Sequence, residues 1–402
     1  MAKTLKFGEN GKWATKTGSS MAYNDQNDNF KPAPFTTERA TSATRVNKQG
    51  LIEVVGNDKL RIDYKDSSNG VALLEPARTN LITNSEKFVD APTGNTNMDV
   101  FSGTITNDNT TSPDGNTKGM KFTISSGSTS TLRIYQSDLS TSADTTFSIY
   151  VKSGTTNSLS INVAGGTATS ATATSVWQRI TTTDTSNSNK FIDVVVSGSV
   201  GDYIYIFGAQ VEQGSYPTSY IPTSGSSATR AADVANGAGN AQVFNDSEGV
   251  LYANIAALAN DDTIRELSIS NGTTTKRVVF RFNAVPNQVR ATVRNSGGNM
   301  FNSNKSINDA TFFNKIAIKY KLNDFALWAN GFELATDTSG STFDANTLDT
   351  LNFDSGAGAN DMFCKTKEIG VYDTALTDAE LEALTSYTSF TNMANELNLT
   401  IR

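Results

Sequence analysis

The sequence predicts an all-β protein made of two tandem β-sandwiches, preceded by an extended N-terminal region and followed by a short helix and a tail. Apolar and polar residues alternate over short runs, and turns rich in Gly, Ser and Asn separate those runs, which is the pattern of half-buried strands. No long segment has a helical period. Hydrophobic residues make up 37% of the 402 residues, enough for packed cores and too many for a disordered chain.

The first sandwich is expected over residues 81–223. Phe147, Ile149 and Val151 fall on one face of a strand, because successive side chains of a strand point to opposite sides. Trp177 is expected to pack in the core. Tyr216 and Tyr220 are expected to pack at a junction between domains. Two further runs are apolar at nearly every position, as expected for central strands covered on both faces: residues 191–196 and 203–207.

The second sandwich is expected over residues 241–402. Val278, Phe280 and Phe282 fall on one side of a predicted strand and alternate with Arg277, Val279 and Arg281. Asn330-Gly331 suits a type I′ hairpin turn, in which both central residues need positive φ. Thr377 begins a capping box with the glutamate three residues later, so a short helix is expected over residues 381–384. The residues after this helix are interpreted as a tail.

Two segments lie outside the predicted sandwiches. Residues 1–80 are expected to form an anchor and connector, in which residues 1–34 have too few apolar residues for a core of their own. These residues either dock on another surface or form a frayed arm. Residues 224–240 are rich in Gly, Ala and Ser and are expected to be a linker.

The chain has no histidine and one cysteine, Cys364, and this restricts its chemistry. Without histidine, Ser-His-Asp and Cys-His catalysis and histidine-ligated zinc are excluded. A hydrolase with two carboxylates would place acidic residues at alternate positions of one strand, but Gly370 and Tyr372 occupy the alternate positions after Glu368. We therefore expect no enzymatic activity and interpret Cys364 as a buried structural thiol.

Composition also limits cofactors and partners. Calcium stays open, because turns at residues 107–109 with Asp114, and at Asn360-Asp361, hold oxygen ligands but no complete ligand spacing; no other cofactor is expected. The net charge of −7 argues against nucleic acid as a partner. No segment approaches the length of a membrane span, so membrane insertion is not expected, and the first residues lack an apolar signal stretch, which fits synthesis in a cytoplasm.

Two features are candidates for binding. Trp328 is out of phase with its core-directed neighbours, so it faces either a ligand or a neighbouring subunit. Four arginines fall on one side of a predicted hairpin, where they can hold acidic polysaccharide or a neighbouring subunit through bidentate bonds, a solvated sheet face being the alternative: Arg277, Arg281, Arg290 and Arg294.

Two segments that bracket the first sandwich carry a family resemblance. Residues 73–81 read LLEPARTNL, and residues 208–223 read GAQVEQGSYPTSYIPT, with TRAAD following at 229–233. Upstream, FTTERAT at 35–41 and RIDY at 61–64 form a lead-in. In this order and spacing the segments resemble a module of tailed-bacteriophage virion proteins, in which they flank a carbohydrate-binding-module-like jelly roll.

The C-terminal half carries a second resemblance. The Asn-Gly hairpin, a later strand ending in Tyr372-Asp373 and the run LTDAEL at 376–381 resemble concanavalin A-like, laminin-G-type jelly rolls. Together the resemblances imply a virion protein, a tail or head fibre or decoration protein, that attaches the particle through lectin-like domains. A non-adhesive protein that braces neighbouring subunits and a polysaccharide-degrading tailspike are the alternatives. The implied partners are other virion proteins, copies of the same chain (a trimer is common in such fibres) and a host-surface glycan.

Overall fold

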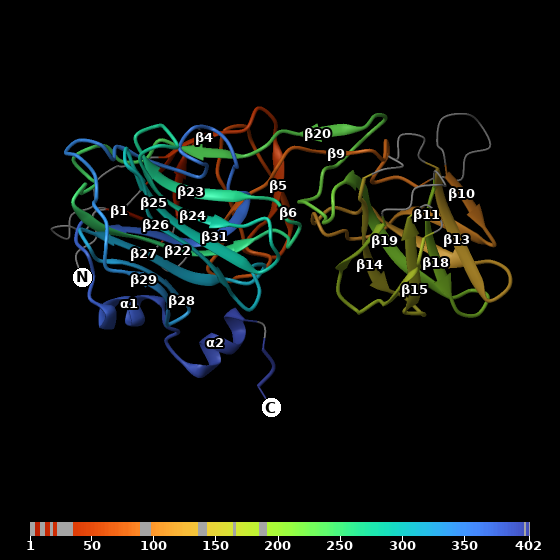
Figure 1. Cartoon of the computed structure of the whole chain (residues 1–402). Coiled ribbons are helices and arrows are strands. Elements are labelled where there is room, and N and C mark those ends of the chain that lie inside the picture. Colours follow the sequence, from red (N-terminus) through yellow and green to blue (C-terminus); the bar gives the residue numbers. More distant parts are fainter. Residues whose placement is uncertain are drawn as a thin grey trace. The chain divides into compact units, whose positions relative to one another are not determined.

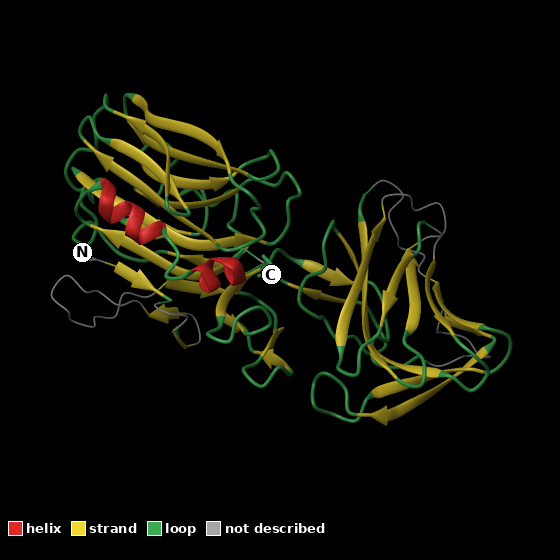
Figure 2. Ribbon diagram, turned by 90° about the horizontal axis from the view of Figure 1, so that it is seen from below, coloured by secondary structure: helices red, strands yellow, loops and turns green. Residues whose placement is uncertain are grey.

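The structure, a computed structural model, describes residues 5–8, 13–16, 19–21, 35–88, 98–135, 143–163, 166–184, 191–397 and 399–401. It confirms the predicted fold class: the protein is all-β, of the jelly-roll sandwich type, with two short helices near its C-terminal end. Figure 2 shows strands throughout the chain and both helices in red.

The chain forms two compact units that are not consecutive in sequence. Unit 1 comprises Met1–Thr41, Gly56–Pro76 and Ala232–Arg402, and unit 2 comprises Ser42–Val55 and Ala77–Ala231. The chain therefore passes between the units four times, after residues 41, 55, 76 and 231. In Figure 1, unit 1 contains both ends of the colour scale, whereas most strands of unit 2 are orange to green.

Unit 1 is a sandwich of two sheets whose facing side chains form one core, including Leu251, Ile318, Ile269 and Phe280. The smaller sheet has the order β26 (Gly298–Ser306), β25 (Gln288–Asn295), β24 (Arg277–Phe282), β23 (Arg265–Ser270) and β30 (Thr350–Asn352). The larger has the order β29 (Phe332–Asp337), β28 (Phe325–Ala329), β27 (Asn314–Lys321), β22 (Glu248–Ala257), β31 (Cys364–Tyr372), β8 (Val71–Leu74) and β7 (Arg61–Asp63), with β1 (Leu5–Phe7) also paired to β31.

Two predicted features of unit 1 are confirmed, and a third differs from the structure. Asn330 and Gly331 both have positive φ, 52° and 88°, at the turn between β28 and β29. Helix α1 (Asp378–Thr385) begins at the predicted capping box, in which the Thr377 hydroxyl accepts from the backbone N–H of Glu380. A second helix, α2 (Phe390–Glu396), follows where the sequence analysis expects a tail.

The predicted N-terminal anchor and the predicted linker differ from the structure. β1, β7 and β8 are strands of the large sheet of unit 1, and β4 (Phe35–Glu38) pairs with β21 (Val234–Asn236), in a sheet that also contains β2 (Ala14–Lys16) and β3 (Ser19–Met21). Residues 224–240 include β20 (Ala228–Arg230) and β21, so they are part of the folded units. The anchor prediction for residues 1–4, 9–12, 17–18 and 22–34 lies outside the described residues.

A buried ionic network joins the separate segments of unit 1. The Asp233 carboxylate accepts from Arg39 Nη1 at 2.7 Å, from Arg61 Nη2 and from the backbone N–H of Glu75 at 2.9 Å. Arg61 Nη1 also donates to Glu75 Oε2 at 2.7 Å, and none of the four residues is more than 5% exposed. Burial alone would lower the pKa of Arg61, but Asp233 and Glu75 raise it above its ordinary value, so the guanidinium stays charged.

Unit 2 is a sandwich of two five-stranded sheets around its own core, which includes Phe147, Ile149 and Val151 as predicted. One sheet has the order β10 (Met98–Phe101), β13 (Thr129–Tyr135), β18 (Phe191–Ser197), β15 (Ser158–Val163) and β16 (Thr169–Thr172). The other has the order β11 (Gly103–Thr110), β12 (Gly119–Ile124), β19 (Tyr203–Gln213), β14 (Thr145–Ser153) and β17 (Gln178–Asp184). Two pairs complete the unit: β5 (Ala43–Val46) with β6 (Ile52–Val55), and β9 (Arg78–Asn80) with β20.

A second buried polar cluster closes unit 2 at the segment after β19. The Glu212 carboxylate is fully buried and accepts from the backbone N–H and the hydroxyl of Thr218, at 2.8 and 2.6 Å, and from the Gln210 amide at 2.8 Å. Gln210 Oε1 in turn accepts from the backbone N–H of Ile221 at 2.6 Å. These bonds fix the chain where it turns back after β19.

The helices seen in the described residues are short. None is long and apolar enough to cross a membrane.

Candidate functional site

Trp328 is not an exposed platform, which corrects the expectation of a ligand-facing or subunit-facing side chain. Its out-of-phase position does point away from the sandwich core, but α1 covers it and leaves the residue 6% exposed. It packs in a separate apolar cluster with Tyr252, Tyr372 and Leu381. The sequence gives the phase of Trp328 in its strand, but not that a helix 50 residues later returns over it.

The four predicted arginines do share one face of the small sheet of unit 1. The register of β24 and β25 places Arg277 opposite Arg294 and Arg281 opposite Arg290. The fully buried Glu266 of β23 accepts from two of them, from Arg277 Nη1 at 3.1 Å and from Arg281 Nε at 2.6 Å. The prediction of a common face is therefore confirmed, while a binding role for it stays a prediction.

The other two arginines of this face have no carboxylate partner among the described residues. Arg290 Nε donates to Asn302 Oδ1 at 2.7 Å, and no bond of Arg294 is found in the described part of the chain. Partial burial and the neighbouring Arg281 lower the pKa of Arg290, while Glu266 opposes them. The face therefore carries an excess of positive charge at its β25 side.

Unit 2 presents a second basic surface, which the sequence analysis missed. Lys121 of β12, Tyr205 of β19 and Lys152 of β14 lie in one row across three neighbouring strands, on the side of the sheet opposite the core. Tyr203 lies two residues before Tyr205 in β19 and points to the same side of the sheet. All four side chains are half-buried. We call this surface the aromatic–lysine face: Lys121, Lys152, Tyr203 and Tyr205.

The aromatic–lysine face is held together by ring and cation contacts. The two tyrosine rings meet edge to face with centroids 5.4 Å apart, Lys121 Nζ lies 3.9 Å from the Tyr203 ring centroid, and Lys152 Nζ lies 5.8 Å from that of Tyr205. A hydrogen bond with Tyr203, and then burial, raise the pKa of Tyr205, which keeps its phenol protonated at neutral pH. The face thus offers ammonium groups beside phenol rings and hydroxyls.

A sequence signal for this face exists. Residues 203–207 are nearly all apolar by residue class, which predicts a strand buried on both sides, but the tyrosines at 203 and 205 alternate with fully buried isoleucines at 204 and 206. Tyrosine carries a polar hydroxyl, so a Tyr-Ile-Tyr-Ile alternation predicts one side that meets solvent.

The rest of this sheet side is covered by aromatic packing. Trp177 lies here and not in the core, which corrects its prediction: its ring packs edge-on against Phe207 with centroids 6.5 Å apart, and its Nε1 donates to the carbonyl of Thr111 at 2.8 Å. Tyr220 covers Phe207 from another direction, with centroids 5.7 Å apart. The aromatic–lysine face is thus the part of this side that these rings leave open.

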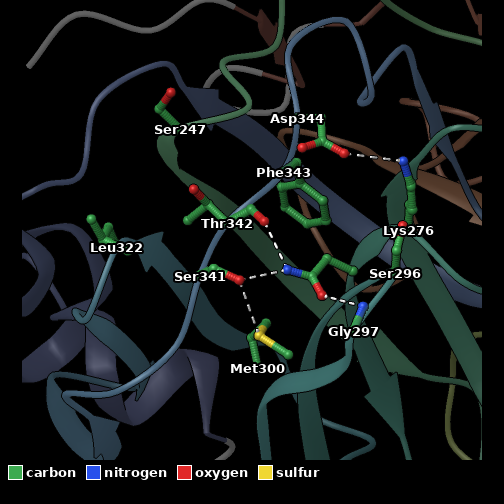
Figure 3. A pocket seen from close by; sticks show the side chains of 11 residues that line it. Ser247, Lys276, Ser296, Gly297, Met300, Leu322, Ser341, Thr342, Phe343 and Asp344 are labelled. Carbon is green, nitrogen blue, oxygen red and sulfur yellow. Dashed lines mark hydrogen bonds and ion pairs between the residues drawn. The ribbon is translucent and has the colours of Figure 1, made fainter.

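Unit 1 has a cavity of about 490 Å³ formed by the loops at one end of its sandwich. Figure 3 shows the side chains of Met300, Leu322 and Phe343 together with serine and threonine hydroxyls and the Lys276–Asp344 ion pair, whose Nζ and Oδ2 are 3.6 Å apart. The Asn295 amide bonds to the Ser341 hydroxyl and to backbone groups, so its hydrogen-bonding capacity is used within the protein. The cavity is mixed in polarity and holds no excess charge.

Metal and nucleophile chemistry has little support in the described residues. No group of three or more acidic, cysteine or histidine side chains there is placed to hold a metal ion. Of the calcium candidates, Asp114 accepts from Ser112, Asn116 and Lys118. Burial and then Asp354 raise the pKa of Asp361, which disfavours the charged form that calcium requires.

Cys364 is expected to be unreactive in the folded protein. It is fully buried, as the sequence predicts, and burial raises the pKa of its thiol to about 12. At pH 8 the thiolate fraction is then on the order of 10⁻⁴. We expect 5,5′-dithiobis(2-nitrobenzoic acid) to label the native protein at pH 8 at least ~100-fold more slowly than the protein in concentrated urea. Rapid labelling of one thiol per native chain would contradict this burial.

No family model and no curated protein matches the chain. Among solved structures, it is similar to domains LG4–5 of the mouse laminin α1 chain, with a TM-score of 0.25 and 10% identity over 63% of this chain and 92% of that one. It is also similar to the CBM22-1–CBM22-2 tandem of Paenibacillus barcinonensis Xyn10C, with a TM-score of 0.24 and 9% identity over 75% of this chain and 100% of that one.

A third similar structure is the leech intramolecular trans-sialidase complexed with 2,7-anhydro-Neu5Ac. The TM-score is 0.32 and the identity 20%, over 39% of this chain, and the matched part spans only 27% of the trans-sialidase.

Proposed function

We propose that this chain is a structural protein of a tailed-bacteriophage virion, of the tail-fibre, head-fibre or decoration type, that attaches the particle to acidic glycans on the host surface. The segments at residues 73–81 and 208–223 support the virion part of the proposal. The aromatic–lysine face of unit 2 carries the binding part.

An acidic sugar needs the groups that this face brings together. A pyranose ring has an apolar side that packs against an aromatic ring, and a carboxylate or sulfate on the sugar bonds strongly to an ammonium group. Tyr203 and Tyr205 supply rings and hydroxyls, while Lys121 and Lys152 flank Tyr205 from the neighbouring strands. The protein as a whole is acidic, with net charge −7, so it repels an acidic glycan at most of its surface. A positively charged face attracts the glycan and determines which surface of the protein meets it.

Half-exposed sites of this kind bind weakly one at a time. Several copies of the chain on one particle, for example in a trimer together with other virion proteins, would raise the overall affinity through effective concentration. In this proposal the chain binds glycan without cleaving it.

Replacing both lysines is expected to weaken binding of acidic oligosaccharide at least about tenfold, because two charge-assisted hydrogen bonds are lost. A Lys121→Ala/Lys152→Ala double variant and a Tyr205→Ala variant are compared with the parent protein on an array of acidic and neutral glycans, followed by titration calorimetry at low and raised salt. Binding by the parent protein should fall as salt rises, and this salt dependence should be smaller in the lysine variant.

The matched controls are Lys48→Ala and Tyr135→Ala, which change residues of the same types elsewhere in unit 2. Both should bind as the parent protein does. A preference for neutral glycans, or unchanged affinity in the double lysine variant, would overturn the proposal. Release of new reducing ends from the glycan would favour the tailspike alternative.

Bracing of neighbouring subunits is a second candidate function. Phe332 and Phe390 of unit 1 are 72% and 68% exposed, an unusual state for large apolar side chains, and contact with another subunit would bury them. Sedimentation of the parent protein and of a Phe332→Ser/Phe390→Ser variant tests this function: a smaller assembly in the variant supports it, and identical assemblies count against it.

A further inference from the structure

A polar cavity of about 500 Å³ opens on the large sheet of unit 1, on the side opposite the sandwich core. Its floor comes from β22, β27 and β31, and its walls come from the turn at residues 66–70 and from α2. The side of the sheet is fixed by β22, where Leu251, Ala253 and Ile255 enter the core while Tyr252 and Asn254 point the other way. The volume lies within the range of small-molecule sites, roughly 300–1,000 Å³.

Three polar side chains form one row across the floor. Asn254 of β22 pairs in register with Lys315 of β27 on one side and with Glu368 of β31 on the other. Neighbouring strands are about 4.8 Å apart, so these groups are spaced at the scale of a small polar molecule. Behind this row, Tyr252 lies opposite Gly370, which has no side chain to fill the space above it.

Two groups of this row keep unused hydrogen-bonding capacity. Asn254 is 8% exposed, and its buried Oδ1 accepts no hydrogen bond from any residue that the structure describes. Lys315 Nζ donates to the carbonyl of Ser386 at 2.7 Å and lies 5.3 Å from the Tyr387 ring centroid. It has no carboxylate within ion-pair distance in the described residues, so it keeps N–H capacity for a ligand. A buried carbonyl oxygen without a donor costs free energy, which a hydroxyl bound in the cavity can recover.

The other charges of the cavity are paired within the protein. Glu368 bonds to Lys6, with Oε1 and Nζ 3.1 Å apart, Lys367 pairs with Glu396 of α2, and Asp66 pairs with Lys365. Each of the three lining carboxylates, Asp66, Glu368 and Glu396, is thus paired with a lysine, and among the described lining residues only Lys315 carries a charge without an ion-pair partner. The remaining wall residues are mostly hydroxyl and amide side chains, including Ser67, Ser68, Asn69, Thr388, Asn392 and Asn395.

We propose that this cavity binds a small neutral saccharide, with Asn254 accepting a hydrogen bond from one sugar hydroxyl and Lys315 donating to another. Neutral sugars match a wall made mostly of amides and hydroxyls because each sugar hydroxyl both donates and accepts, and one unpaired ammonium group can donate to such a hydroxyl. This site is separate from the aromatic–lysine face, which lies in the other unit and carries net positive charge. In this proposal unit 1 binds neutral sugars and unit 2 binds acidic ones.

The test uses the full chain and a panel of free monosaccharides: glucose, galactose, mannose and N-acetylglucosamine as neutral probes, with glucuronate and glucosamine as charged ones. Saturation-transfer NMR finds which of them bind, and titration of the best ligand measures its affinity. We expect millimolar binding of at least one neutral sugar, weakened about three- to tenfold by Asn254→Ala and also weakened by Asn395→Ala. Asn395 is exposed on α2, so its replacement is a second probe should Asn254→Ala fail to fold.

Two controls separate this site from the aromatic–lysine face. Asn304→Ala, an exposed asparagine of the small sheet, should leave neutral-sugar binding unchanged, as should the Lys121→Ala/Lys152→Ala variant. Failure of all four neutral sugars to bind, or binding that neither Asn254→Ala nor Asn395→Ala weakens, overturns the proposal. Preferential binding of glucuronate or of glucosamine overturns it as well, because the cavity would then select charge.

Discussion

Asp233→Ala is expected to lower the free energy of unfolding of unit 1 by about 3–5 kcal/mol, because it leaves two buried guanidinium groups without their shared carboxylate. Arg39 and Arg61 are 2% and 0% exposed, so water cannot replace the lost partner. The backbone N–H of Glu75 loses its acceptor at the same time. Urea unfolding measures the effect in a Trp177→Phe background, where the remaining tryptophans, Trp13 and Trp328, both belong to unit 1.

The matched control is Asp344→Ala, which also removes a carboxylate paired with a cation in unit 1. The Asp344 side chain is 89% exposed and its oxygen lies 3.6 Å from Lys276 Nζ, so we expect a loss below about 1 kcal/mol. Equal effects of the two variants would show that the network around Asp233 does not hold unit 1 together.

Glu212→Ala is expected to destabilise unit 2 by about 2–5 kcal/mol, since it removes the acceptor of three hydrogen bonds in a site that solvent does not reach. The Thr218 N–H and hydroxyl and the Gln210 amide then lack a partner. Trp177 is the sole tryptophan of unit 2, so its fluorescence in a Trp13→Phe/Trp328→Phe background follows this unit alone.

Glu53→Ala is the comparison for unit 2. Its ion pair with Arg45, at 3.3 Å, is partly exposed, and we expect its loss to cost less than about 1 kcal/mol. A Glu212 variant that unfolds at the urea concentration of the Glu53 variant would remove the structural role assigned to the buried carboxylate.

These two predictions give a physical meaning to the segments that resemble phage virion proteins. Glu75 and Asp233 lie in the segments at 73–81 and 229–233, and Glu212 lies in the segment at 208–223. Glu75 and Asp233 hold separate stretches of chain together, and Glu212 fixes the chain where it turns back after β19, so these motifs mark a way of folding.

Local features of the fold were predictable from the sequence because neighbouring residues determine them. Alternation placed Phe147, Ile149 and Val151 in the core, and two adjacent residues with positive φ formed the turn at Asn330-Gly331. The helix at Thr377 began where its capping box indicated. The common side of the four arginines followed from the same period of two.

Long-range pairings were not predictable in this way. β1 pairs Leu5 with Val371, and β8 pairs Leu74 with Cys364, and nothing in a segment of three or four residues indicates a partner some 300 residues away. The return of α1 over Trp328 and the position of Glu266 beneath the arginines are likewise products of the tertiary fold. The aromatic–lysine face was not predicted for a different reason. Residues 203–207 are apolar by residue class and suggest a strand buried on both sides, although each tyrosine carries a hydroxyl that can meet solvent.

The nested order of the two units has a consequence for synthesis of the chain. Unit 2 is complete once the ribosome has passed Ala231, whereas β1 and β8 lack their partner strand until β31, which begins at Cys364, has been synthesised. The nascent chain therefore contains a folded unit 2 between strands whose edges are still unpaired. Unpaired strand edges promote aggregation. Early folding of unit 2 keeps the two earlier segments of unit 1, residues 1–41 and 56–76, close to each other until β31 has been synthesised.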